Sequence, residues 1–221
     1  MFNLFKRNNE VTKLYSDLTP GERIDRLFEE KIGLFLIKYD FRFIKSKSLF
    51  KRQIGEFSQE IAISKSKWNL GDEVCSFWLV FSVTADTYQG WHTQKYGTPP
   101  LNSIVTGFYH NHLKNWKTKY KRDKYNLSKQ DNETVFEEIK FNLENVILPL
   151  LEKFRDYESS ADTLMNKKEY WWAAKIYDYY LMSGKPDKAK QALLAGKNYY
   201  NRQKDPQREH HEAFLLRLKQ K

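Results

Sequence analysis

The chain has 221 residues, a formal net charge of +10 at pH 7, and 40% hydrophobic residues, with aromatic residues making up 16% of the chain. This apolar content excludes a disordered chain, and the single cysteine excludes an internal disulfide. No window approaches the roughly 18–20 apolar residues that span a bilayer, and residues 1–9 do not resemble a secretory signal. We therefore expect a soluble, cytoplasmic protein without a membrane partner.

The first helix is predicted from its start signal. Residues 1–18 have no clear period and predict an N-terminal arm. Thr19 and Glu22 then flank Pro20 in the arrangement of a capping box. Apolar residues recur at helical spacing up to about Tyr39 and predict a helix over 19–39. They are Ile24, Leu27, Phe28, Ile32 and Phe35.

From Phe41 the apolar period changes to two, which is typical of strands. Short alternating runs follow up to residue 65, separated by turn residues. The clearest run, Cys75–Ala85, predicts a strand with one fully buried face. That face holds Cys75, Phe77, Leu79, Phe81 and Val83. Trp78 lies on the other face, which either meets another helix or forms the floor of an open binding surface.

The stretch 84–98 shows no sustained period and predicts a loop, with a further short strand as an alternative. It carries Trp91 and Tyr96. Aromatic side chains in a loop either pin the loop over the core or line a binding surface. Together with Trp78, these two residues are our candidates for a ligand surface.

Helical spacing returns in the second half of the chain. It predicts one long helix over 101–122 and a second over 135–154 that Pro149 should kink. Three shorter helices follow within 170–218, joined by tight turns. We predict an α+β fold in which an antiparallel meander of four or five strands packs against helix 19–39 and the two long helices. The expected domains are 19–157 and a helical hairpin lobe over 158–221.

The helical lobe resembles a single tetratricopeptide repeat. Tyrosine, glycine, alanine, a large apolar residue and a small residue stand where that repeat requires them. These are Tyr180, Gly184, Ala189, Leu193 and Gly196. Tyr177 replaces a small residue of the pattern, and no second copy is visible. One repeat cannot form the usual peptide groove, so the resemblance implies an intramolecular brace rather than a peptide receptor.

Residues 19–154 resemble a bacterial family that is known only as a domain of unknown function. The resemblance rests on the order of a helix, the stretch YDFRFIKSKSLFKR, the stretch FSQEIAISKSKWN and the strand CSFWLVFSV. It implies a helix, an aromatic and basic link, and an antiparallel meander followed by helices. It implies no activity and no functional residue.

A basic ladder is the candidate polyanion site. Lysines recur every three or four residues on the predicted helix 101–122 and just beyond it, and Trp116 lies on the neighbouring stripe. The lysines are Lys114, Lys117, Lys121 and Lys124. Such a ladder can follow phosphates while the ring stacks on a base. The alternative is an amphipathic surface helix with its aromatic residues in the core.

Catalytic and metal-binding motifs are missing from the sequence. It has no glycine-rich phosphate loop, no G-x-S-x-G, no H-E-x-x-H and no Cys-x-x-Cys. His110 and His112 diverge on a helix and do not form a metal site. We expect no cofactor, and the oligomeric state is open. Our first hypothesis is a non-enzymatic intracellular module that binds a protein partner. The alternatives are a nucleic-acid-binding protein and an enzyme of unrecognised type.

Overall fold

The computed structural model describes residues 11–121 and 124–219. The chain divides into two compact units. The first unit comprises Met1–Arg52, Gln59–Ser82 and Gly107–Leu148, and the second comprises Gln53–Ser58, Val83–Thr106 and Pro149–Lys221. The sequence-based division at residue 157 differs from these units, because the segment between two central strands belongs with the C-terminal helices.

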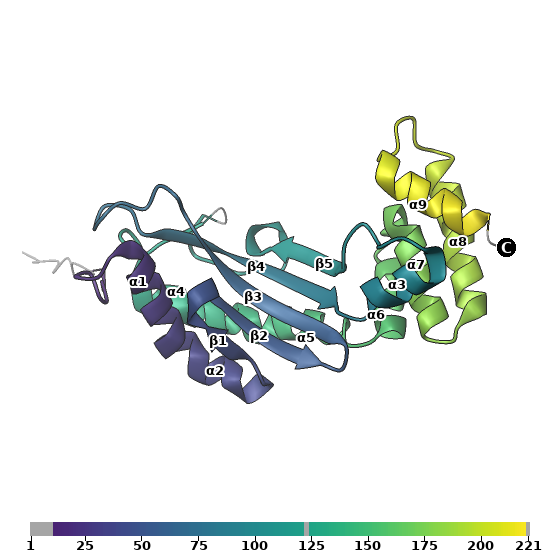
Figure 1. Ribbon diagram of the computed structural model, residues 1–221. Coiled ribbons are helices and arrows are strands. Elements are labelled where there is room, and N and C mark those ends of the chain that lie inside the picture. Colours follow the sequence, from purple (N-terminus) through teal and green to yellow (C-terminus); the bar gives the residue numbers. More distant parts are fainter. Residues whose placement is uncertain (1–10, 122–123, 220–221) are drawn as a thin grey trace, which may run out of the picture. The chain divides into compact units, whose positions relative to one another are not determined.

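The predicted α+β fold with an antiparallel meander is confirmed (Figure 1). The strands follow one another in the sheet in chain order, and a short sixth strand pairs with β4. The strands are β1 (Arg42–Ile44), β2 (Leu49–Ile54), β3 (Phe57–Lys65), β4 (Ser76–Ala85), β5 (Ile104–Tyr109) and β6 (Tyr125–Asn126). Phe43 lies opposite Phe50 in the register of β1 and β2, and their rings are 4.7 Å apart.

The predicted N-terminal helix begins with the expected cap. The Thr19 side chain accepts from the Glu22 backbone N–H, and the Glu22 carboxylate accepts from the Thr19 N–H, so both orphan donors are satisfied. The helix runs as α1 (Pro20–Leu27), a π-helical turn, α2 (Leu34–Leu36) and a 3₁₀ turn that ends at Tyr39. Among the described residues, no helix is long and apolar enough to cross a bilayer.

The core of the first unit forms where three elements meet. Phe28, which follows α1, contacts Phe77 of β4 and Phe136 of α4 (Asn132–Asn142), with both ring distances at 5.1 Å. All five residues on the predicted inner face of Cys75–Ala85 are fully buried, so that prediction is confirmed. Each large apolar side chain removed from water stabilises the fold by about 1.5–3 kcal/mol.

Two local predictions are wrong. Ile104–Tyr109 forms β5 rather than part of a long helix, and Tyr88–Tyr96 forms the helix α3 rather than a loop or strand. The β5 stretch is rich in β-branched and aromatic residues, which suit a strand that pairs with β4. The predicted helix with Pro149 is α4, then a π-helical turn, then α5 (Leu148–Leu151), in which Pro149 lies at the start.

The N-terminal arm is held where it is described; residues 1–10 lie outside the described part of the chain. The backbone N–H groups of Thr12 and Leu14 donate to the side chains of Asp131 and Asn132, each at 2.9 Å. The buried Arg23 donates to the Leu14 carbonyl at 2.7 Å. Residues 12–14 are therefore anchored to the first unit.

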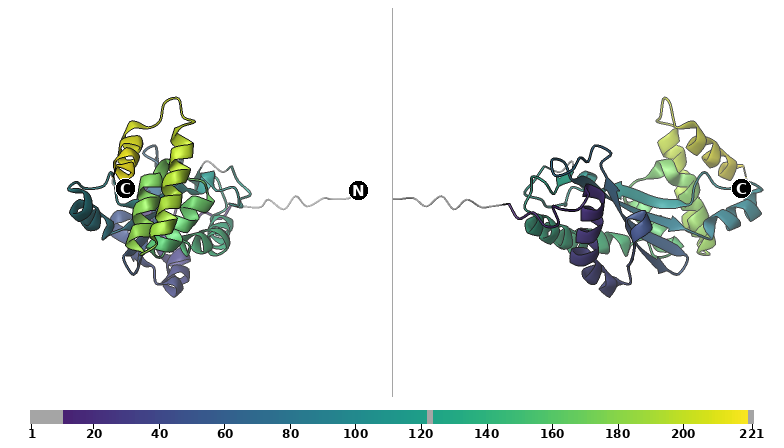
Figure 2. Two further views of the ribbon diagram at one scale, coloured as in Figure 1. Left: turned by 90° about the vertical axis from the view of Figure 1, so that its right-hand side faces the viewer. Right: turned by 60° about the vertical axis from the view of Figure 1, so that its left-hand side comes forward.

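The second unit contains a set of packed helices. They are α6 (Tyr157–Asn166), a 3₁₀ turn (Tyr170–Trp172), α7 (Ala173–Met182), α8 (Pro186–Tyr200) and α9 (Arg208–Leu218). The helices α6, α7 and α8 lie side by side, and α9 packs on α7 and α8 (Figure 2). The close approach depends on Gly196, because a Cβ there would lie 2.4 Å from the Cβ of Ala173 and 2.7 Å from the Phe214 ring.

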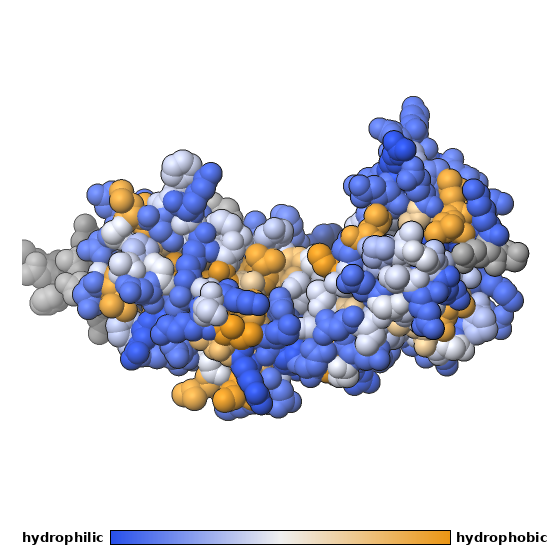
Figure 3. All heavy atoms as spheres, in the orientation of Figure 1, coloured by the Kyte–Doolittle hydropathy of each residue, from blue (hydrophilic) through white to orange (hydrophobic). Residues whose placement is uncertain are grey.

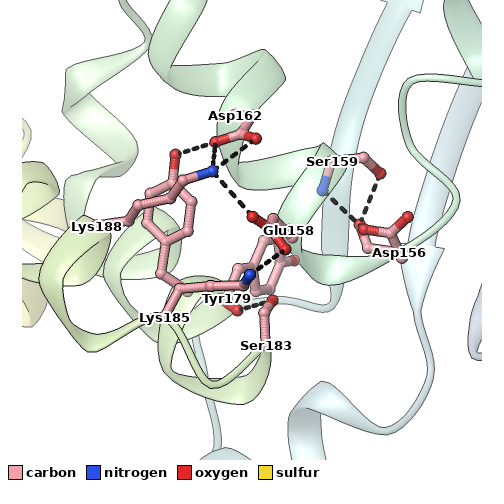
Figure 4. Close-up of polar contacts among 9 residues, drawn as sticks. Asp156, Glu158, Ser159, Asp162, Tyr179, Ser183, Lys185 and Lys188 are labelled. Atoms are coloured by element: carbon pink, nitrogen blue, oxygen red, sulfur yellow. Dashed lines mark hydrogen bonds and ion pairs between the residues drawn. The ribbon is translucent and has the colours of Figure 1, made fainter.

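Ion pairs join α6 to α8 on the same unit (Figure 4). The Lys188 ammonium donates to the Glu158 carboxylate at 2.9 Å and to Asp162 at 3.0 Å, and Tyr180 donates to Asp162 at 2.7 Å. The hydrogen bond from Lys188 lowers the pKa of Glu158. These side chains are partly exposed, so each ion pair adds little to the free energy of unfolding. The network contributes to the orientation of α6 relative to α8.

Candidate binding site

The second unit is organised around one buried carboxylate. Asp178 of α7 is fully buried and accepts from the hydroxyls of Tyr88 and Tyr96, both on α3, at 2.8 and 2.6 Å. Arg217 of α9 donates to the same carboxylate from Nη2 at 2.5 Å and from Nε at 3.3 Å. Asp178 thus fixes three helices that are far apart in the sequence.

The electrostatics of this centre follow from burial. Burial and the negative charge of Asp178 raise the pKa of Tyr88, which therefore stays protonated and donates. Burial opposes the charge of Arg217, but the hydrogen bonds and the attraction of Asp178 outweigh it and raise the pKa of Arg217. The charged pair is thus the stable state of the site.

His92 of α3 completes the centre in a defined tautomer. Its Nε2 lies 2.6 Å from Arg217 Nη2, and because a guanidinium only donates, Nε2 accepts. Its Nδ1 therefore carries the proton and donates to the Thr98 carbonyl at 2.6 Å. Burial lowers the pKa of His92, which keeps the ring neutral, as this arrangement requires.

Lys175 lies beside this centre, and no carboxylate in the described part of the chain is at hydrogen-bond distance from it. Its Nζ donates to the Ile104 carbonyl at 2.6 Å and to Asn102 Oδ1 at 2.8 Å, and it lies 4.1 Å from the centre of the Trp172 ring. Burial lowers the pKa of Lys175 to about 7, and the charge of Asp178 opposes this shift only in part.

Three hollows run along α9 and share residues, and we call them together the α9 groove. The first, of about 360 Å³, is lined by Trp171, Tyr199, Tyr200, Gln203, Asp205, Pro206, Gln207 and His210. A narrow middle hollow shares Trp171 and His210 with the first. The third, again of about 360 Å³, shares Pro100 and Arg217 with the middle one and is also lined by Leu216.

The groove offers both apolar surface and hydrogen-bonding groups. Figure 3 shows hydrophobic residues over α9 within a largely hydrophilic face, and Leu216, which lines the third hollow, is 38% exposed. Trp172 lines the middle hollow, and its indole N–H is buried without an acceptor among the described residues. A buried donor of this kind is normally satisfied by water or a ligand.

The predicted ligand surface is divided by the structure. Trp91 and Tyr96 come together on α3, with ring centroids 5.9 Å apart, and Tyr96 donates to Asp178. Both lie in the second unit, where Tyr96 is part of the Asp178 centre. Trp78 is half-buried on β4 in the first unit, so the three residues are not one site within either unit.

The predicted basic ladder is wrong in its geometry. Residues 110–121 contain a 3₁₀ turn and irregular backbone rather than a long helix, so the helical stripe does not exist. Lys114, Lys117, Lys121 and Lys124 are exposed, but Trp116 is fully buried, and its indole N–H donates to the Tyr125 hydroxyl at 2.9 Å. Trp116 therefore cannot stack on a base.

The structure gives His110 a structural role and shows no metal cluster among the described residues. His110 is buried and its Nδ1 accepts from the Leu79 backbone N–H at 3.1 Å, which is a structural role. Within the described ranges, no three His, Cys, Asp or Glu side chains are grouped as a metal ion would require.

No sequence motif marks the residues of the α9 groove. The stretch Tyr170–Met182 reads as an aromatic-rich helix, and a lone Asp178 among aromatic side chains was the available signal of a buried polar centre. Comparison of the chain with protein-family models, curated proteins and solved structures finds no match. The resemblances drawn from the sequence therefore stay predictions.

Proposed function

We propose that this protein is a non-enzymatic intracellular binding module that holds an extended segment of a partner protein in the α9 groove. The observation that carries the proposal is that three neighbouring hollows beside α9 share lining residues. An extended segment presents side chains that can occupy the two wider hollows on either side of the middle one.

The framework under the groove favours binding without rearrangement. Asp178 and Arg217 are buried and paired, and they join α7 to α9 directly beneath the hollows that Arg217 lines. A site held by such contacts loses little conformational entropy when a ligand binds.

Selection of peptides from a random library against the intact protein tests this proposal. Leu216→Asp places a charge in the groove, and Leu194→Asp is the matched control, because Leu194 is an exposed leucine on α8 that does not line the groove. We expect the selected peptides to bind Leu216→Asp at least ~10-fold more weakly than Leu194→Asp, which is about 1.4 kcal/mol.

Two outcomes would contradict the proposal. The first is a library that yields no peptide with saturable binding, or peptides that bind both variants alike. The second is turnover in a broad screen of hydrolase and transferase substrates that Leu216→Asp abolishes, which would make the groove an active site.

A further inference from the structure

The first hollow of the α9 groove differs in charge from the rest of this basic protein. Its walls include the aromatic side chains of Trp171, Tyr199 and Tyr200, and among the described residues that line it Asp205 has the only carboxylate. None of these described wall residues is a lysine or arginine, although the chain carries a net charge of +10. Arg202 and Lys204 are exposed in the same loop but are not part of the walls.

We propose that this hollow binds an alkylammonium group, supplied by a lysine side chain of the partner segment or by a free quaternary amine. The electron-rich faces of tryptophan and tyrosine attract cations, and a carboxylate at the rim adds to that attraction. An anion would meet the charge of Asp205 with no cation in the walls to offset it. The lysine source rests on the proposed function, whereas the cation site itself does not.

The aromatic walls are fixed in place before any ligand arrives. The Trp171 indole N–H donates to the Glu169 carboxylate at 2.6 Å, and the Tyr200 hydroxyl donates to the Trp171 carbonyl at 2.7 Å. The Tyr200 ring is buried between His211, at 4.8 Å, and Phe214, at 4.9 Å, so it supports the walls and leaves Trp171 and Tyr199 as the rings available to a cation. Because these contacts restrict rotation of the rings, a bound cation would find them already positioned.

The remaining titratable wall residue does not compete with a cation. His210 lies 4.9 Å from the Trp171 ring in an edge-on contact. Burial and the nearby charge of Lys175 lower the pKa of His210, so the imidazole is neutral at pH 7. The volume of about 360 Å³ is within the range of small-ligand pockets.

The test compares choline with 3,3-dimethyl-1-butanol, a neutral molecule of the same shape. Binding is followed by the indole N–H resonance of Trp171, which is assigned with Trp171→Phe. We expect choline to shift this resonance saturably and the alcohol to bind at least ~5-fold more weakly. Titration with N-acetyl-lysine N-methylamide identifies the source: if it also binds, a partner's lysine can supply the cation, and if only choline binds, the ligand is a free quaternary amine.

Single substitutions show whether Tyr199 and Asp205 contribute to choline binding. Tyr199→Leu and Asp205→Asn should each weaken choline binding by at least ~3-fold. Asp187→Asn should leave it unchanged, because Asp187 is an exposed acid at the start of α8, outside the hollow. Near-ultraviolet circular dichroism verifies that each variant is folded.

The cation site is overturned if choline and the lysine compound produce no shift beyond that of sodium chloride at equal concentration. Equal binding of choline and the alcohol also overturns it, as does full binding by Tyr199→Leu together with Asp205→Asn. None of these results depends on Leu216, so the cation site and the proposed peptide groove can fail separately.

Discussion

Arg217 donates to Asp178 at 2.5 Å, and the two side chains are 2% and 0% exposed. The pair joins α7 to α9, and its two residues are 39 positions apart in the sequence. A charge pair removed from water in this way is stable only while both members are present, because either charge alone would be left without compensation in a medium of low dielectric constant.

Replacement of Asp178 by asparagine should therefore destabilise the second unit strongly. Asp178→Asn keeps the shape of the side chain but leaves Arg217 as an unpaired buried cation, and we expect the free energy of unfolding to fall by about 3–5 kcal/mol. Urea unfolding followed by circular dichroism measures the change. Asp187→Asn removes an exposed carboxylate and should alter stability by less than about 0.5 kcal/mol. Equal stability of the two variants would show that the buried pair does not hold these helices.

Two glycines in the second unit should respond to alanine in opposite directions. At Gly196 the added methyl would lie 2.4 Å from Ala173, so Gly196→Ala should cost about 1–3 kcal/mol in spite of the higher helix propensity of alanine. At Gly90 on α3 nothing lies within 4 Å of the added atom, so Gly90→Ala should stabilise by about 0.5–1 kcal/mol. Thermal unfolding of both variants checks the sign, and a neutral or stabilising Gly196→Ala would refute the close packing.

The amine of Lys175 should make stability depend on pH above neutrality. Its pKa is about 7 in the folded state, against an ordinary value of 10.5 when unfolded. Between these values the unfolded state binds more protons, so the wild type should gain stability relative to Lys175→Met as the pH rises. The slope should be at most about 1.4 kcal/mol per pH unit, and below pH 7 the difference should be constant.

Urea unfolding of the wild type and Lys175→Met in parallel between pH 6 and pH 10 measures this difference. Groups common to both proteins cancel in the comparison. A difference that is flat across the whole range, or that falls as the pH rises, would show that Lys175 is charged in the folded state.

The thiol of Cys75 should be protected in the folded protein. Cys75 is fully buried next to the Pro20 carbonyl, with an S–O distance of 3.6 Å, and burial raises its pKa to about 11. At pH 8 only about one thiol in a thousand is then ionised, and the thiolate is the reactive form. We expect an aromatic disulfide reagent to label the native protein far more slowly than the protein in guanidinium chloride. Equal rates would contradict the buried position.

The sequence predicts an element correctly where its local pattern is compatible with only one kind of secondary structure. Thr19, Pro20 and Glu22 predict the start of the first helix because their cap contacts lie within four residues. The alternation from Cys75 to Ala85 predicts a strand with a buried face because every second side chain points the same way. Pattern reasoning failed at Ile104 and Val105, whose spacing fits a helix and whose β-branched side chains fit a strand. Pairing with β4 decides between the two.

By itself, the sequence determined the α+β class, the antiparallel succession of strands up to β4 and the apolar face of β4, because these depend on periodicity and on contacts between near neighbours. Only the tertiary structure decided that Trp116 is buried, that Tyr88–Tyr96 is a helix bound to Asp178, and that Trp171, Tyr199 and Asp205 line one hollow. These facts depend on contacts between residues up to 125 positions apart, as for His92 and Arg217. Which side chains are buried, and which distant residues they contact, is decided by tertiary packing, which overrides local sequence patterns.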